Sequence, residues 1–168
     1  MSRRAFITCA LGLVLLCSGC RLSVASAYRL PRVALETPLG EIVIEIEVER
    51  APVTAANFLG YVDAGLYDHG QFHRSVTLDN QPDNEVLIEV VQASRGGGIL
   101  GFEPIALERT SETGLRHLDA TVSMARGGPD SAPSDFFICI GDQPTLDFGG
   151  RRNDDGQGFA AFGESCRE

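Results

Sequence analysis

The sequence predicts a mainly β domain, and three observations lead to this prediction. Apolar and polar residues alternate over 42–48, further short apolar runs are separated by Gly, Pro, Asp and Asn, and 19 of the 168 residues are glycine. Short strands with frequent turn residues are typical of a barrel or a sandwich. A length of 168 residues is that of a single domain.

The first predicted element is a hairpin with one buried face. Residues 33–35 and 42–48 alternate between apolar and polar side chains, and Pro38-Leu39-Gly40 interrupts them. Successive side chains of a strand point to opposite faces of the sheet. Glu45 and Glu47 are therefore expected on the solvated face, where they would not form a ligand cluster.

The second predicted element is a helix of about three turns within residues 51–65. Pro52 lies near its start and Gly65 just past its end, as is common at helix termini. Gly60 inside the helix indicates a close approach by a neighbouring group, or is simply tolerated. A stripe of apolar residues at three- and four-residue spacing would cover the open end of a barrel. The stripe consists of Ala55, Phe58, Leu59 and Val62.

Short strands and polar loops are predicted for the rest of the chain. The strands are expected at Gln71–Val76, Val86–Gln92, Thr121–Ala125 and Phe136–Ile140. The loops are expected at 77–85, 94–98 and 149–158. Functional sites are often framed by loops of this kind.

The composition argues against a nucleic-acid partner. The net charge is −9, every basic residue is an arginine, and no basic cluster follows the first few residues. Proteins that bind nucleic acid usually present a basic patch or stripe. A hydrophobic content of 43% also predicts a folded chain rather than a disordered one.

Residues 1–27 differ in kind from the rest and predict a secretory signal. Arg3 and Arg4 precede an apolar run over 5–17, and small residues end the segment at 25–27. The apolar run is too short to span a membrane comfortably, so a retained membrane helix is not expected. We expect export to the periplasm or cell envelope.

Two features of this signal stay open. The paired arginines and Phe6 resemble a twin-arginine export signal, and an ordinary charged leader is the alternative. Cleavage after Ala27 is preferred and would leave a domain of residues 28–168. The segment ending at Cys20 also resembles a bacterial lipoprotein box, in which that cysteine would carry a lipid anchor.

The cysteine pattern predicts neither a disulfide framework nor a metal site. Of five cysteines, only Cys139 and Cys166 lie outside the leader and its cleavage region. Cys139 lies within the apolar run 136–140 and is expected in the core rather than as a nucleophile. An oxidising compartment would still permit the two cysteines to pair.

A series of short motifs runs through the body of the sequence. In order, they are Thr37-Pro38-Leu39-Gly40, Ala51-Pro52 to Asn57-Phe58, Gly65-Leu66-Tyr67-Asp68, Phe72-His73-Arg74, Val91-Gln92, Val122-Ser123-Met124-Ala125-Arg126, Ser134-Asp135-Phe136-Phe137-Ile138, Leu146-Asp147 and Phe162-Gly163. Across about residues 33–163 this ordered set resembles the cyclophilins, which are peptidyl-prolyl cis-trans isomerases.

The resemblance implies an eight-stranded antiparallel barrel with capping helices and a shallow peptide groove on its outer wall. It implies a monomer that uses no cofactor or metal and that acts on proline-containing polypeptide segments. We therefore expect acceleration of X-Pro isomerisation during the folding of exported proteins. The alternative is a peptide-binding module of the same shape with weak or no catalysis.

The resemblance also implies the site residues. Arg74 matches the catalytic arginine of the family, and Phe137 matches the floor of its proline pocket. The substrate-binding residues would be Gln92, Val90, Ala125, Arg126, Gly127, Phe137, Leu146 and Phe159. The backbone of 125–127 would hold the substrate, whereas His73 is expected to pack in the barrel rather than to act as a base.

The chain departs from the best-known cyclophilins at several positions of the groove. The departures are Glu89 and Val90 for Phe and Met, Asp135 for Gln, Thr145 for an aromatic residue, and Phe159 for His. Residues 77–84 look like an insertion, which makes the alignment of the first two departures open.

The end of the sequence also departs from the family. After Phe162-Gly163 the family would continue into a strand and a closing helix, but only five residues follow. The prediction is a domain that lacks its last strand and helix. A single-nucleotide deletion after Gly163 is one hypothesis for this ending.

Overall fold

The computed structural model describes residues 29–96 and 101–166. The predicted secretory signal over 1–27 and the predicted lipid anchor at Cys20 lie outside the described residues. Within the described part of the chain, no helix is both long and apolar enough to cross a membrane.

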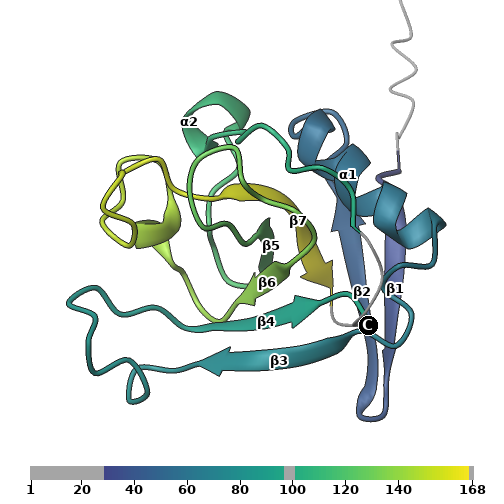
Figure 1. Ribbon diagram of the computed structural model, residues 1–168, viewed down its shortest axis with the longest axis horizontal. Coiled ribbons are helices and arrows are strands. Elements are labelled where there is room, and N and C mark those ends of the chain that lie inside the picture. Colours follow the sequence, from purple (N-terminus) through teal and green to yellow (C-terminus); the bar gives the residue numbers. More distant parts are fainter. Residues whose placement is uncertain (1–28, 97–100, 167–168) are drawn as a thin grey trace, which may run out of the picture.

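Seven antiparallel strands form one curled sheet, so the prediction of a mainly β domain is confirmed (Figure 1). The strands are β1 (Arg32–Thr37), β2 (Gly40–Ile46), β3 (Gln71–Val76), β4 (Val90–Ser94), β5 (Thr121–Met124), β6 (Phe136–Cys139) and β7 (Ala160–Cys166). Their spatial order is β1-β2-β7-β5-β6-β4-β3. The described residues thus form seven of the eight expected strands, with β1 and β3 at the two edges of the sheet.

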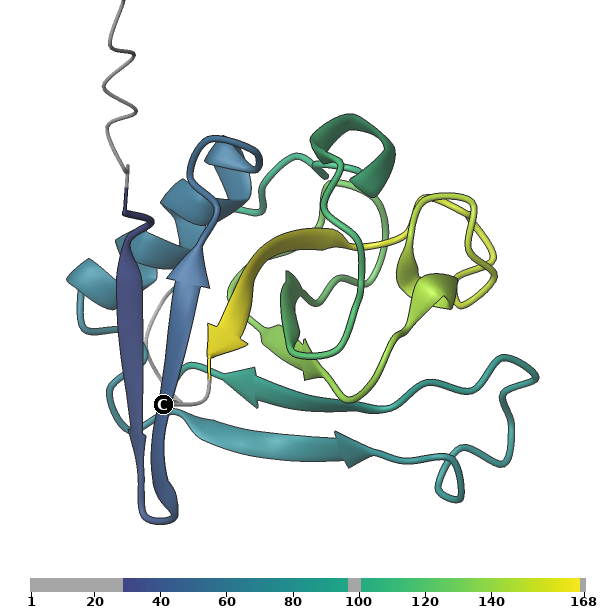
Figure 2. The ribbon, with the colours of Figure 1, turned by 180° about the vertical axis from the view of Figure 1, so that it is seen from behind.

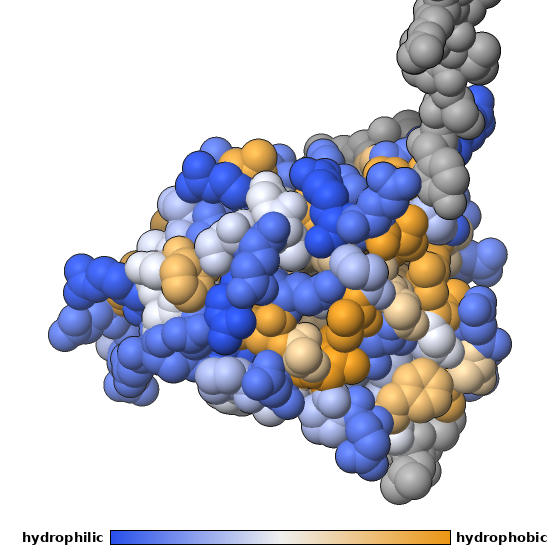
Figure 3. Space-filling view, turned by 90° about the horizontal axis from the view of Figure 1, so that it is seen from above, coloured by the Kyte–Doolittle hydropathy of each residue, from blue (hydrophilic) through white to orange (hydrophobic). Residues whose placement is uncertain are grey.

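The sheet wraps around one main core, and α1 (Pro52–Asp63) and the short α2 (Thr110–Thr113) lie at one end of the molecule, as the two opposite views show (Figures 1 and 2). A 3-10 turn, η1, spans Pro144–Leu146. On one face of the molecule, apolar side chains gather in patches between hydrophilic ones (Figure 3).

The predicted hairpin is formed by β1 and β2. Leu35 pairs with Ile42, and the turn places Gly40 at a φ of 133°, a conformation that favours glycine. Ile44 and Ile46 are fully buried, as the alternation predicts. Glu45 is half-buried and accepts a 2.9 Å hydrogen bond from Arg32 at the surface.

Helix α1 begins at Pro52, as predicted. The backbone N–H groups of Val53 and Thr54 donate to the Glu108 carboxylate at 3.0 and 2.7 Å, which satisfies free donors of its first turn. Phe58 of the predicted stripe is fully buried. A Cβ at Gly60 would lie only 3.3 Å from the Phe102 ring, so this glycine does permit a close approach.

The predicted apolar stripe of α1 is rotated in part. Ala55 and Phe58 are buried as expected, but Leu59 and Val62 are only half-buried. The fully buried Tyr61 takes part of their place, and its hydroxyl accepts a 2.7 Å hydrogen bond from the Phe102 backbone. Leu59 and Val62 still pack against the main core, and the apolar spacing does not reveal the polar contact of Tyr61.

Strand β4 begins four residues later than predicted, at Val90 rather than Val86. The side-chain amide of the buried Gln81 donates to the carbonyls of Thr77 and Ile88 at 2.7 and 2.8 Å. This amide holds the backbone near Ile88 in the β3–β4 arm (residues 77–89) instead of in the sheet ladder. The predicted strand bounds were wrong here because a side chain replaced the ladder partner.

Candidate active site

Arg74 and Gln92 lie opposite each other on the neighbouring strands β3 and β4. The register shifts between Phe72 and Arg74, and such irregularities re-aim side chains. Arg74 is exposed, and its Nη1 donates a long 3.5 Å hydrogen bond to Gln92 Oε1. The structure therefore brings together the two predicted polar residues of the groove.

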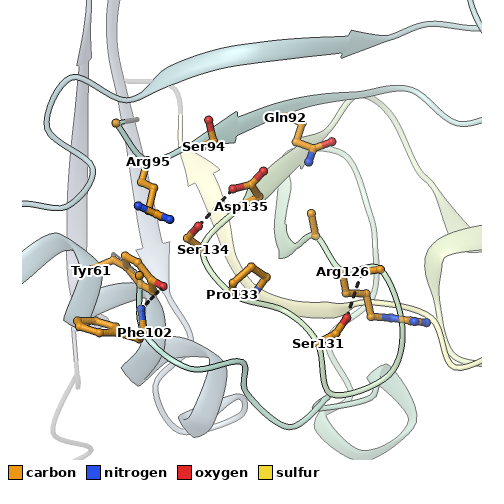
Figure 4. A pocket seen from close by; sticks show the side chains of 14 residues that line it. Tyr61, Gln92, Ser94, Arg95, Phe102, Arg126, Ser131, Pro133, Ser134 and Asp135 are labelled. Carbon is orange, nitrogen blue, oxygen red and sulfur yellow. Dashed lines mark hydrogen bonds between the residues drawn. The ribbon is translucent and has the colours of Figure 1, made fainter. Parts of the chain in front are cut away.

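Gln92 lines a cavity that we call the Gln92 cavity (Figure 4). Strand β4 supplies Gln92 and Ser94, and the chain between β5 and β6 supplies the opposite side. The cavity is lined by Tyr61, Gln92, Ser94, Arg95, Gly96, Gly101, Phe102, Ala125, Arg126, Gly127, Ser131, Pro133, Ser134 and Asp135. Four predicted site residues, Gln92 and those at 125–127, are thus neighbours.

A tight turn holds the 125–127 segment in place. Ser131 Oγ accepts hydrogen bonds from the backbone N–H groups of Gly127 and Gly128 at 3.2 and 2.8 Å. The Ala125 N–H donates to the Asp135 carbonyl at 2.8 Å. These bonds fix the backbone that was predicted to hold a peptide.

The predicted apolar wall residues form a second cluster, separate from the main core. Its buried members are Val76, Ile88, Val90, Phe137, Cys139 and Leu146, with Ala125 and Phe159 packed against them. The Phe137 and Phe159 rings meet edge to face with centroids 5.4 Å apart. The structure therefore unites five predicted wall residues, and Phe137 is only 4% exposed.

A buried polar network that the sequence analysis missed lies behind Phe137. The Asp147 carboxylate accepts from the backbone N–H of His117 at 3.0 Å and lies 2.8 Å from His117 Nδ1. His117 Nε2 lies 3.0 Å from Ser123 Oγ, and the His117 ring stacks near Phe137 at 6.1 Å. Ser123 is fully buried, so this set supports the wall and offers no accessible nucleophile.

The environment of Asp147 keeps it charged. Burial alone would raise the pKa of this carboxyl group, but hydrogen bonds from His117 and Arg116 outweigh burial and lower it. The sequence signal for this site was weak, because Asp147 and His117 are 30 positions apart. The motif Leu146-Asp147 was noted without a role for its acid.

Arg126 contributes its backbone to the cavity but turns its guanidinium away from it (Figure 4). The guanidinium donates to both Asp155 carboxylate oxygens at 2.7 and 2.9 Å and to the Gly158 carbonyl at 2.7 Å. It also lies over the Phe159 ring at 5.2 Å. This side chain fastens the loop 147–158, and hydrogen bonds from it lower the pKa of Asp155 to about 2.

The prediction that His73 packs inside the barrel was wrong. His73 is exposed, and its Nε2 lies 3.9 Å from Asp135 Oδ2. Strand β3 is an edge strand whose side chains are mostly exposed, because no described element covers its outer face. The alternation along the strand does not show whether a face of the sheet is covered, so the sequence could not reveal this outcome.

Cys139 is a core residue, as predicted. It is 1% exposed, and burial raises the pKa of its thiol to about 12. Cys139 and Cys166 are both free. No group of three or more His, Cys, Asp or Glu side chains in the described part of the chain is placed to hold a metal ion.

Known proteins of similar sequence cover most of the chain. The family model described as cyclophilin type peptidyl-prolyl cis-trans isomerase/CLD matches residues 32–165. Peptidyl-prolyl cis-trans isomerase A of Dickeya dadantii is 34% identical over 137 residues, which are 79% of this chain and 64% of that protein. Peptidyl-prolyl cis-trans isomerase cyp18 of Streptomyces antibioticus is 34% identical over 140 residues, 78% of this chain and 74% of that protein.

A solved structure has the same fold. The cyclophilin type peptidyl-prolyl cis-trans isomerase of Cryptosporidium parvum, determined in the presence of the dipeptide Ala-Pro, superposes with a TM-score of 0.63. The superposition covers 82% of this chain and 80% of that one at 21% sequence identity. This likeness extends the sequence match to the arrangement of the strands.

Proposed function

This chain belongs to the cyclophilin-type peptidyl-prolyl cis-trans isomerases, and we propose that it accelerates the isomerisation of X-Pro peptide bonds with Arg74 as its catalytic residue. The observation that carries the proposal is the position of Arg74. Its guanidinium is exposed and shares a 3.5 Å hydrogen bond with Gln92, which itself lines the Gln92 cavity.

The reaction needs no covalent intermediate with the protein. Rotation about the peptide bond breaks no σ bond, but it loses amide resonance and meets a barrier of about 18–20 kcal/mol. In the twisted state the proline nitrogen regains a lone pair. A donor beside that nitrogen therefore stabilises the transition state more than the planar ground state.

An arginine suits this task because its donors stay charged and are fixed in a planar fork. A thousandfold acceleration requires about 4 kcal/mol. One charge-assisted hydrogen bond contributes about 1.5–3 kcal/mol. The remainder would come from the wall around Phe137 and Leu146, which would hold the proline ring and exclude water while the preceding residue turns.

The substrate class follows from the shape of the site. The fixed backbone of 125–127 lines the Gln92 cavity, where an extended peptide would lie along it, and Ala125 packs against the Phe137 cluster. The Ala-Pro dipeptide present with the Cryptosporidium parvum relative is a ligand of the same chemical class. We therefore propose proline-containing polypeptide segments as substrates.

We further propose that the protein acts on exported proteins in the cell envelope. The support is the leader-like pattern of residues 1–27, which precedes the family match at residues 32–165. Expression of the full chain in a bacterium, followed by fractionation and N-terminal sequencing, tests this. A mature N-terminus at residue 28 is expected. An intact leader in the cytoplasm would refute export, and lipid labelling at Cys20 would identify an anchor instead.

The isomerase proposal is tested with a short X-Pro peptide in a protease-coupled assay of the full chain. Arg74→Ala should lower kcat/KM by about tenfold to a hundredfold, the worth of one charge-assisted hydrogen bond. Arg50→Ala removes another surface arginine, which binds Glu47, and should not change the rate. Equal rates at the uncatalysed value for wild type and Arg74→Ala would refute the proposal.

A second candidate is a peptide-binding module without catalysis. The observation that favours it is the small apolar surface offered by the wall, since Phe137 and Leu146 are only 4% and 1% exposed. Titration of the same peptide separates the two candidates. Binding by the wild type without any acceleration would support the module.

A further inference from the structure

The loop 147–158 is a built structure and not a loose connection. The Gly149 N–H donates to the Gly156 carbonyl at 2.8 Å, and the Arg152 N–H donates to the Thr145 carbonyl at 3.2 Å. Arg126, whose side chain is 1% exposed, forms an ion pair with Asp155 of this loop. The backbone of residue 152 is therefore held in a defined position.

The Arg152 side chain reaches from this loop to the β3–β4 arm. Its Nη1 donates to the Val86 carbonyl at 2.6 Å. Both views place the loop and the arm at the same end of the molecule (Figures 1 and 2). The two segments enclose a second cavity, lined by residues 83–86, Gly127 and 149–156.

The second cavity adjoins the Gln92 cavity, because Gly127 lines both. A peptide that crosses the Gln92 cavity beside Gly127 would therefore extend toward Arg152. A strand advances about 3.3 Å per residue. Arg152 would then meet a substrate residue within a few positions of the proline.

Among the described residues, Arg152 and Arg74 differ from five other arginines in having no carboxylate partner, and Arg151, which also lines the second cavity, shares this feature. Five arginines bind a carboxylate within the described residues, namely Arg32, Arg50, Arg109, Arg116 and Arg126. Within the described part of the chain, the side chain of Arg74 bonds only Gln92, and the side chain of Arg152 bonds only the Val86 carbonyl. Asp83, Glu85 and Asp154 line the second cavity, yet none of them forms an ion pair with Arg152.

The two guanidinium groups also lie within electrostatic reach of each other. Burial lowers the pKa of Arg152, and the positive charge of Arg74 lowers it further. Neither guanidinium is paired with a carboxylate among the described residues, so each has donors that can bind a carboxylate of a bound peptide. The chain has 23 acidic residues, so the lack of a carboxylate partner at Arg74 and Arg152 is not due to a shortage of acids.

We propose that Arg152 is a specificity-determining residue, which binds a carboxylate side chain of the substrate a few residues from the proline. The proposal rests on the isomerase function proposed above. With Nη1 held by Val86, the remaining guanidinium N–H groups are available to a carboxylate, for which the planar fork of arginine is well matched. Substrates with Glu or Asp near X-Pro would therefore be preferred.

The test uses peptide pairs that differ only by Glu or Gln. One X-Pro peptide is made with Glu at each of three positions on either side of the proline, each with its Gln counterpart. The measured quantity is the ratio of kcat/KM for Glu over Gln at each position. For the wild type we expect a ratio of about five at one or two neighbouring positions, the upper range for a partly exposed ion pair.

The variants assign this preference to one residue. Arg152→Gln should bring the ratio to about one, and Arg152→Lys should keep part of it because the charge remains without the fork. Arg50→Gln makes the same change in net charge far from the loop in sequence and should keep the wild-type ratio. Thermal unfolding of each variant shows whether it is folded.

Each outcome decides the proposal. A wild-type ratio near one at all positions, or an unchanged preference in Arg152→Gln, overturns it. If Arg152→Gln does not fold, the wild-type series and Arg152→Lys still decide, since an undiminished ratio in the lysine variant excludes recognition by the fork. Failure of the isomerase proposal is distinct, because then neither the Glu nor the Gln peptides are accelerated.

Discussion

The strand side of the candidate site, formed by Arg74 and Gln92, and its inner side, formed by the Phe137 cluster, are held in different ways. On the strand side, Arg74 of the mostly exposed edge strand β3 is joined to Gln92 of β4 by one 3.5 Å hydrogen bond. On the inner side, Phe137 is backed by the His117 and Asp147 network, and Phe159 is clamped by Arg126. The candidate site thus combines one lightly held cation with a wall that is fixed by several buried interactions.

This difference suits a reaction that rotates one part of a substrate against another. The wall must hold the proline ring still, and buried, fully satisfied hydrogen bonds provide that stiffness. The cation must follow a nitrogen whose geometry changes, and an exposed arginine retains the freedom to do so. Substitutions on the inner side should therefore reduce stability, whereas those on the strand side should reduce activity alone.

The largest expected effect is on the inner side, at Asp147. Asp147→Ala removes the acceptor of the His117 backbone N–H and of its buried ring. Leaving these groups unsatisfied should lower the free energy of unfolding by about 2–4 kcal/mol. Urea unfolding followed by circular dichroism measures this change.

The control for Asp147→Ala is Asp154→Ala, which removes an exposed acid from the same loop. Its effect should stay within about 0.5 kcal/mol. A loss below about 1 kcal/mol for Asp147→Ala would show that the inner side is not held as tightly as the hydrogen bonds indicate.

The next largest effect should arise on the strand side, at Gln92. Gln92→Ala removes the hydrogen-bond partner of Arg74, and a broader range of guanidinium positions should lower kcat/KM by about fivefold, or about 1 kcal/mol. Gln92 is only half-buried, so the free energy of unfolding should change by less than about 0.5 kcal/mol. Peptide kinetics and urea unfolding on the same sample check both parts. A stability loss as large as the activity loss would remove the contrast between the two sides.

Much of the strand side could be predicted from the sequence, because its information is local. The hairpin follows from alternation over 42–48, and the bounds of β3 were predicted correctly at Gln71–Val76. Arg74 and Gln92 were proposed through the resemblance to a family, and the observed pairing of β3 with β4 places them opposite each other. The fate of His73 could not be predicted, since an edge strand and a central strand have the same local pattern.

The supports of the inner side could not be predicted, because they depend on contacts between distant segments. Asp155 lies 29 positions from Arg126, and His117 lies 30 positions from Asp147. Nothing in the spacing of these residues marks them as partners. The apolar members, such as Phe137, could be proposed only through the resemblance to a family.

The smallest and most local effect concerns the pKa of Asp155. Hydrogen bonds from Arg126 and from the Gln157 N–H lower this pKa to about 2, below the ordinary value of about 3.9. A lowered pKa in the folded state means that the stabilisation is complete above about pH 4 and is lost as the pH falls toward 2. The clamp on the loop should therefore be unaffected between pH 5 and 8.

A carboxyl NMR titration of Asp155 measures this pKa directly. Arg126→Gln should raise it toward the ordinary value, but not fully, because the Gln157 N–H still donates at 2.8 Å. Asp154, the adjacent acid, serves as the internal control within the same spectra. If the pKa of Asp155 did not move in Arg126→Gln, the backbone alone would hold the carboxylate. The inner side would then be fixed without the clamp, and the two sides of the candidate site would differ less than the hydrogen bonds indicate.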